Sequence, residues 1–149
     1  MFQHILCPTD LADRSLLALE KAVQLAHQFG AKITLLNIHA EFMNKEEREM
    51  LRVSVEKMKK KFAETAIQAR EKMKEMIHDL HADDVPLNYM LREGKPSRTI
   101  PEVAKEVGAD LIVIATDGRD NIADFVAGTI TEHVINHSPC PVLVIPYNS

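Results

Sequence analysis

Hydrophobic and polar positions along this chain follow two alternating periods, one typical of buried strands and one typical of amphipathic helices. Short apolar runs predict five strands, at residues 4–8, 33–38, 85–91, 110–115 and 142–145. Between these runs, apolar residues recur every three or four positions and predict helices at residues 13–29, within 45–80, at 94–107 and at 128–137. Two of these helices are followed by a glycine that would end them, at Gly30 and Gly108. The chain is therefore predicted to alternate between strand and helix from end to end.

Residues 45–80 carry the longest helical pattern, rich in glutamate, lysine, methionine and alanine. Its apolar positions are Met58, Phe62, Ala66, Ala69, Met73, Met76 and Leu80. Because a helix in a globular domain is rarely this long, we expect a break or an irregular start before about residue 52. The spacing also resembles a coiled-coil seam, but it has fewer than four clean heptads. We therefore favour one helix lying across a sheet.

Strands that alternate with helices indicate a parallel sheet with right-handed crossovers and helices on both faces. We predict a single α/β domain over residues 1–149, doubly wound, with five strands in the order 3-2-1-4-5 or a close relative. Strands 1 and 4 then flank the point where the winding direction reverses. Ligands of such sheets bind there, beyond the carboxyl ends of the strands. The turns at residues 7–10 and 115–118 should therefore line two sides of one cleft.

Glycines at and after the second of these turns indicate a ligand. Gly118 lies in the turn itself, and Gly128 and Thr129 open the last predicted helix. Glycine lets a backbone approach a ligand closely, and the first N–H groups of a helix have no partner within that helix. The combination predicts an anion-binding segment, with a phosphate as the expected anion.

Composition and charge narrow the classes of function. A chain of 149 residues with 46% hydrophobic residues can bury a core, and its net charge of -4 supplies no basic surface for nucleic acid. Its apolar runs are too short to span a membrane, and its first residues lack the pattern of a secretory signal. Cys7 and Cys140 are its only cysteines, which gives no disulfide framework. We expect a cytoplasmic protein that binds neither nucleic acid nor membrane.

Five short segments form an ordered set along essentially the whole chain. They are I-L-C-P-T-D near the start, L-L-N-I-H, E-G-K-P-S-R-T-I, G-A-D-L-I-V-I-A-T-D-G-R, and S-P-C-P-V-L-V-I-P near the end. The set resembles the universal stress protein family. The resemblance implies a flavodoxin-like fold with the strand order given above and a homodimer. It also implies a sensor or regulator of the stress response that binds an adenine nucleotide, ATP or AMP.

The resemblance implies roles for residues beside the first two strands. Asp10 matches an acidic residue that contacts the adenosine, and Pro8 and Thr9 line the same wall. Ile38 matches an apolar residue that borders the base. Without the resemblance, Asp10 could equally make a turn or cap the following helix.

The opposite wall would come from the glycine segment. The family signature is a glycine, two residues, a glycine, nine residues, a glycine, and then serine or threonine. Ala115 stands in place of the first glycine, and Gly118 and Arg119 follow it past the expected ribose and phosphates. Amides and hydroxyls at the helix start would come from Gly128, Thr129, Ile130 and Thr131.

This chain departs from the family pattern at the same turn. Ala115 brings a methyl group where nucleotide-binding members have glycine. Asp117, Asp120 and Asp124 add carboxylates that only Arg119 offsets, and carboxylates repel the phosphates of ATP. Three outcomes remain open: Mg²⁺ bridges carboxylates and phosphates, the site prefers AMP, or no nucleotide binds. In the third case the protein acts through contact with a protein partner.

The remaining residues give no clear indication of a catalytic or metal site. Nothing resembles a nucleophile with its base or a pair of catalytic carboxylates, so we expect no enzyme beyond slow incidental hydrolysis of ATP. His133 and His137 lie four residues apart and could ligate zinc, but a third ligand is not evident, so we interpret them as structural. Cys7 is interpreted as a buried apolar residue. The apolar strand at residues 142–145 ends the predicted sheet, so we expect two copies to pair along it.

Overall fold

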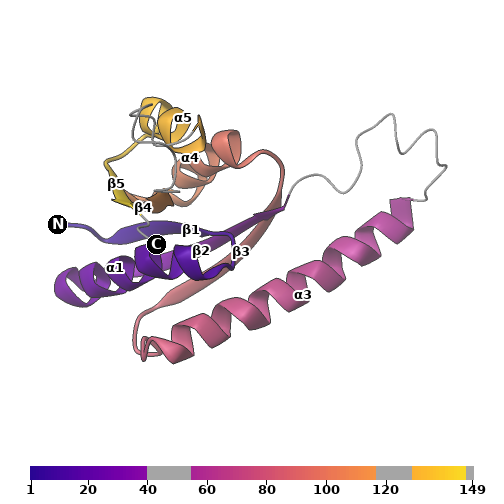
Figure 1. Cartoon of the computed structure of the whole chain (residues 1–149), viewed down its shortest axis with the longest axis horizontal. Helices are drawn as coiled ribbons and strands as arrows, with labels where there is room; N and C mark the ends of the chain where they lie inside the picture. Colours follow the sequence, from indigo (N-terminus) through magenta and orange to yellow (C-terminus); the bar gives the residue numbers. More distant parts are fainter. Residues whose placement is uncertain (40–54, 117–128, 147–149) are drawn as a thin grey trace.

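The computed structural model describes residues 1–39, 55–116 and 129–146, and within these ranges strands and helices alternate as predicted (Figure 1). The elements are β1 (His4–Thr9), α1 (Asp13–Phe29), β2 (Lys32–His39), α3 (Val55–Asp79), β3 (Leu87–Glu93), α4 (Pro96–Val107), β4 (Leu111–Thr116), α5 (Thr129–His137) and β5 (Val142–Pro146). Gly30 and Gly108 end α1 and α4 in the left-handed conformation, with φ of 68° and 69°. The predicted helix ends are confirmed at both positions.

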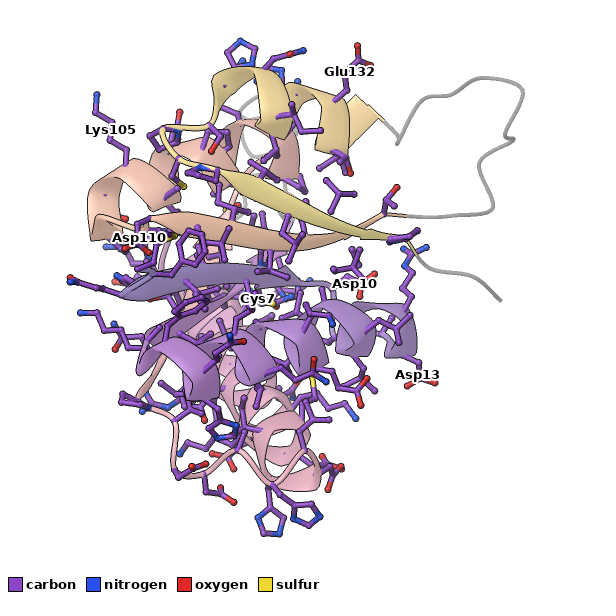
Figure 2. The ribbon with its side chains drawn as sticks, turned by 90° about the vertical axis from the view of Figure 1, so that its left-hand side faces the viewer. Cys7, Asp10, Asp13, Lys105, Asp110 and Glu132 are labelled. Atoms are coloured by element: carbon purple, nitrogen blue, oxygen red, sulfur yellow. The ribbon has the colours of Figure 1, made fainter. Side chains whose placement is uncertain are left out.

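The strands form one parallel sheet in the order β3-β2-β1-β4-β5, which confirms the predicted doubly wound fold. Helices α1 and α3 cover one face of this sheet, and α4 and α5 cover the other (Figures 1 and 2). Each face has its own apolar cluster. Ile5 and Cys7 of β1 belong to the cluster under α1 and α3, whereas Leu6 belongs to the cluster under α4. A strand buried on both sides explains why its sequence is apolar without alternation.

The third strand begins two residues later than predicted. Val85 is buried, as its apolar character suggests, but its N–H donates to the Ala82 carbonyl (3.0 Å) within a turn. Pro86 follows, and its carbonyl accepts from the N–H of Ile33 (2.9 Å). Proline has no N–H for a ladder, so the regular strand starts only at Leu87.

Helix α3 is a single helix of 25 residues, about 37 Å long. Its buried side chains are concentrated in its carboxyl-terminal half. The fully buried positions are Ala69, Met73, Met76 and Ile77. They pack in the cluster shared with α1, while the amino-terminal half extends beyond the sheet (Figure 1). This supports a helix lying across the sheet. The irregular start expected before about residue 52 falls outside the described residues.

Gly94, between β3 and α4, should tolerate a side chain least among the three glycines in the described ranges. Its φ is +148°, and an added Cβ would lie 2.9 Å from the hydroxyl oxygen of Thr99. We expect Gly94→Ala to lower the free energy of unfolding by about 2–4 kcal/mol, from backbone strain together with overpacking. The control is Gly30→Ala, where φ is +68° but nothing lies within 4 Å, and the expected loss is about 1–2 kcal/mol. Urea unfolding measures both values, and equal losses would contradict the steric argument.

At the amino-terminal ends of the strands, the side chain of Asp110 accepts hydrogen bonds from backbone N–H groups that lead into β1. The carboxylate of Asp110 accepts from the N–H groups of Gln3 (2.8 Å) and His4 (3.0 Å). The N–H of Asp110 in turn donates to the His4 carbonyl (2.9 Å). The buried His4 ring bonds through Nε2 to the Thr34 hydroxyl (2.6 Å) on β2. These bonds connect the starts of three adjacent strands.

His4 should make the fold sensitive to mild acid. Burial, aided by the positive charge of Lys32, lowers the pKa of the His4 imidazole against the opposing effects of Val107 and Asp110. The unfolded chain therefore binds the proton first as pH falls below about 6.5, so stability falls from there toward the folded pKa and then levels off. We expect urea midpoints to fall between pH 7 and pH 5 in the native chain, with a smaller fall in His4→Gln. An identical pH dependence in both proteins would exclude His4 as the cause.

Candidate functional site

The carboxyl ends of β1 and β4 form the switch point that the strand order predicts. Within the described residues, β1 and β4 are in register only at Ile5–Leu111 and Leu6–Ile112. Both strands continue beyond these pairs, to Thr9 and Thr116. By contrast, β1 stays paired with β2 as far as Thr9 and Asn37. The two central strands therefore separate toward their carboxyl ends, at the position where doubly wound sheets bind ligands.

The turn after β1 is ordered by a chain of hydroxyl groups. The Thr9 hydroxyl oxygen accepts from the N–H of Leu11 (3.0 Å) and lies 2.7 Å from the Ser15 hydroxyl. Ser15 donates to the Ala12 carbonyl (2.7 Å), so Thr9 supplies the proton of the bond between the two hydroxyls. Both hydroxyl side chains are buried. They attach the end of β1 to the first turn of α1.

Leu11 has a left-handed backbone conformation that its residue type does not predict. Its φ is 67°, in the left-handed region, which costs a branched side chain about 1–3 kcal/mol. Bonds on both sides maintain it: Thr9 accepts from Leu11, and Asp10 accepts from Ala12. The turn that presents Asp10 is thus fixed before any ligand binds.

Asp10 lies at the switch point, and both of its carboxylate oxygens accept hydrogen bonds from the start of α1 (Figure 2). Its Oδ1 accepts from the N–H of Ala12 (2.9 Å) and its Oδ2 from Nε of Arg14 (2.9 Å). Burial acts to raise the pKa of this carboxyl, but the bonds from Ala12, Arg14 and Ser15, together with the charge of Arg14, outweigh it and the pKa is lowered. The side chain remains 44% exposed. Asp10 is therefore an ionised, partly accessible acceptor that also forms the turn.

Asn37 on β2 is a site residue that the sequence interpretation missed. It is 3% exposed, and its Nδ2 donates to the Thr9 carbonyl (2.9 Å). Its Oδ1 is buried with no hydrogen-bond partner among the residues that the structure describes. A polar residue inside the apolar run of β2 was the available signal. Asn37 fixes the last peptide of β1 and brings an acceptor to the carboxyl edge of the sheet.

The other predicted residues divide between the two faces of the sheet. Pro8 and Thr9 end β1, Ile38 packs against the cluster under α4, and Ala115 packs against the cluster under α1 and α3. The Ala115 methyl group therefore lies on the α1 side of the sheet. On α5, Ile130 is exposed and Thr131 is buried. Gly118, Arg119, Gly128, the carboxylates of Asp117, Asp120 and Asp124, and the Thr129 side chain lie outside the described residues.

Comparison with known proteins agrees with this geometry. The sequence model of the universal stress protein family matches residues 1–146. The chain belongs to the universal stress protein family. A universal stress protein from Methanocaldococcus jannaschii is 29% identical over 147 residues, which are 97% of this chain and 82% of that protein.

Solved structures of other universal stress proteins have the same fold. One from Lactobacillus plantarum matches with a TM-score of 0.74 and 26% identity, covering 97% of each chain. Another, solved in complex with cAMP, matches with a TM-score of 0.68 and 22% identity, covering 99% of this chain and 98% of that one.

Cys7 packs in the strand that leads to the switch point of this universal stress protein. Cys7 is fully buried, and burial raises the pKa of its thiol to about 12, so the thiolate does not form near neutral pH. Its interpretation as an apolar packing residue is confirmed.

Residues 1–39, 55–116 and 129–146 contain no group of three or more metal-binding side chains and no helix able to span a membrane.

Proposed function

We propose that this universal stress protein binds an adenine nucleotide between the carboxyl ends of β1 and β4 and acts as a sensor or regulator of the stress response. The observation that carries the proposal is the separation of β1 from β4 beside a fixed turn that presents an ionised Asp10. The related protein solved with cAMP supports an adenine nucleotide as the ligand class. Binding without turnover suffices for this role, so we propose no enzymatic activity.

Asp10 and Arg14 suggest how a nucleotide would enter. Their ion pair is exposed on both sides, so it contributes little to stability. A phosphate carries more charge than a carboxylate and accepts paired bonds from guanidinium, so it competes with Asp10 for Arg14. Release of Arg14 frees Oδ2 to accept from the hydroxyl or amino groups of the nucleoside. Oδ1 stays on Ala12 and keeps the turn in place.

We propose AMP or ATP as the nucleotide, with Mg²⁺ strengthening the binding of ATP. The segment after β4 carries Asp117, Asp120 and Asp124 against Arg119 alone. Each further phosphate therefore adds repulsion, which a cation with oxygen ligands relieves.

We also propose a cytoplasmic homodimer paired along β5, an edge strand of the sheet. Free thiols at Cys7 and Cys140 suit a reducing compartment.

Calorimetric titration with ATP and AMP, with Mg²⁺ or with EDTA, tests the proposal. We expect AMP to bind at least as well as ATP in EDTA, and Mg²⁺ to improve ATP far more than AMP. Much tighter binding of ATP in EDTA would show that the carboxylates face away from the phosphates. If neither nucleotide binds under any condition, the alternative holds, a family member that acts through a protein partner alone.

A further inference from the structure

Helix α5 carries two histidines, one helical turn apart, whose rings are stacked. The ring centroids of His133 and His137 are 3.9 Å apart, and the ring planes differ by 15°. Residues four apart lie on the same helical face, so this arrangement follows from the sequence spacing. Val134 is fully buried in the cluster shared with α4 and anchors the helix. The rings are therefore presented to solvent from a rigid support, with His137 exposed and His133 half-buried.

A hydrogen bond fixes the tautomer of one ring. Nδ1 of His137 lies 2.9 Å from the carbonyl oxygen of His133. A carbonyl can only accept, so Nδ1 carries the proton and Nε2 of the neutral ring keeps its lone pair. Histidines that bind metals usually donate their second nitrogen to a carbonyl or carboxylate in this way. The bond thus prepares His137 as a metal ligand, a feature that the spacing alone did not reveal.

We propose that His133 and His137 form a two-nitrogen chelate for a borderline divalent transition metal, with Ni²⁺, Cu²⁺ and Zn²⁺ as the class. Metal–nitrogen bonds of about 2.0–2.1 Å place two adjacent ligand nitrogens about 3 Å apart. In the stacked arrangement the two ring planes are nearly parallel, so the His133 ring must turn until both nitrogen lone pairs, which lie in the ring planes, converge on one metal. Water or a ligand from another molecule fills the remaining coordination positions.

The ligand chemistry sets this site apart from the Mg²⁺ proposed for ATP. Imidazole favours late first-row metals, whereas Mg²⁺ takes oxygen ligands. No third metal-binding side chain joins the pair within the described parts of the chain, so the affinity rests on two nitrogens. The proposal does not depend on nucleotide binding.

Titration of the full chain with Ni²⁺ at pH 7.5, in a buffer that does not bind metals, tests the chelate. Ni²⁺ is preferred as the probe because thiols such as Cys140, which is half-buried, reduce Cu²⁺. We expect one Ni²⁺ per chain, at least a tenfold loss of affinity in His133→Ala and in His137→Ala, and weaker binding of Co²⁺. His78→Ala removes an exposed histidine from α3 and should leave the affinity unchanged.

Circular dichroism verifies that each variant is folded, and His137→Gln provides a second variant that keeps a polar side chain of similar size. Unchanged Ni²⁺ affinity in all three variants of α5 would overturn the proposal. It would also be overturned if His78→Ala lost as much affinity as the α5 variants, because Ni²⁺ would then bind surface histidines without selection.

Discussion

Replacing Asp10 with alanine should weaken adenine-nucleotide binding by about 1–3 kcal/mol, or roughly 5- to 150-fold in Kd. The carboxylate is ionised, half-exposed and oriented by Ala12 and Arg14, so its removal leaves a donor of the bound nucleoside unpaired. Calorimetry with AMP measures the effect. Asp10→Asn, which keeps one oxygen acceptor, should lose less affinity than Asp10→Ala.

Asp13 supplies the matched control for this substitution. It lies in the first turn of the same helix, and its side chain points away from the switch point (Figure 2). Asp13→Ala makes the same change in charge and should leave AMP affinity within twofold. Because Asp10 also forms the turn, its loss should cost about 0.5–1.5 kcal/mol of stability, so titrations belong well below the melting temperature. Unchanged AMP affinity in folded Asp10→Ala would rule out the proposed contact.

Val144→Lys should convert the proposed homodimer into monomers at micromolar concentration. Val144 lies on β5, which ends the sheet and can pair with a second copy across a two-fold axis. A lysine from each chain would bring like charges into that contact. Light scattering measures the mass, and Val144→Pro, which removes a backbone donor from the edge, should act in the same direction.

Met90→Lys separates a loss of pairing from a general loss of stability. Met90 lies on β3, the opposite edge of the sheet, and packs against the same apolar cluster as Val144. This variant should therefore remain dimeric. A monomeric native protein, or a dimer that survives both changes at Val144, would contradict pairing along β5.

Features set by local sequence were predictable, and those set by distant contacts were not. Gly30 and Gly108 end helices because the required backbone conformation is local. The strand order follows from the alternation of elements, which permits few topologies. The left-handed Leu11 is a local exception: its conformation is maintained by the neighbouring Thr9 and Asp10, and a leucine does not indicate it. The bond from Asn37 to Thr9 spans 28 residues and exists only once β1 and β2 pair.

The positions of the strand ends beside the proposed site were predictable, whereas most contacts within the turn after β1 were not. The turn after β1 was located correctly, since carboxyl ends of parallel strands meet at one edge. The turn that the sequence left open for Asp10 is present in the bond from the N–H of Ala12. The bond from Arg14 was not foreseen, because a sequence does not show that this side chain reaches back to Asp10. The sequence showed that Ala115 adds a methyl group at the end of β4, but not that this group packs on the α1 side of the sheet.

The uneven burial of α3 has a consequence for how the molecule opens to solvent. Its fully buried residues begin at Ala69, so a local unwinding that starts near Val55 exposes little apolar surface and leaves the sheet intact. Amide hydrogen exchange along this one helix should therefore slow progressively toward Met76. Binding of another molecule at the amino-terminal turns of α3 could then order or unwind these turns without changing the stability of the apolar core.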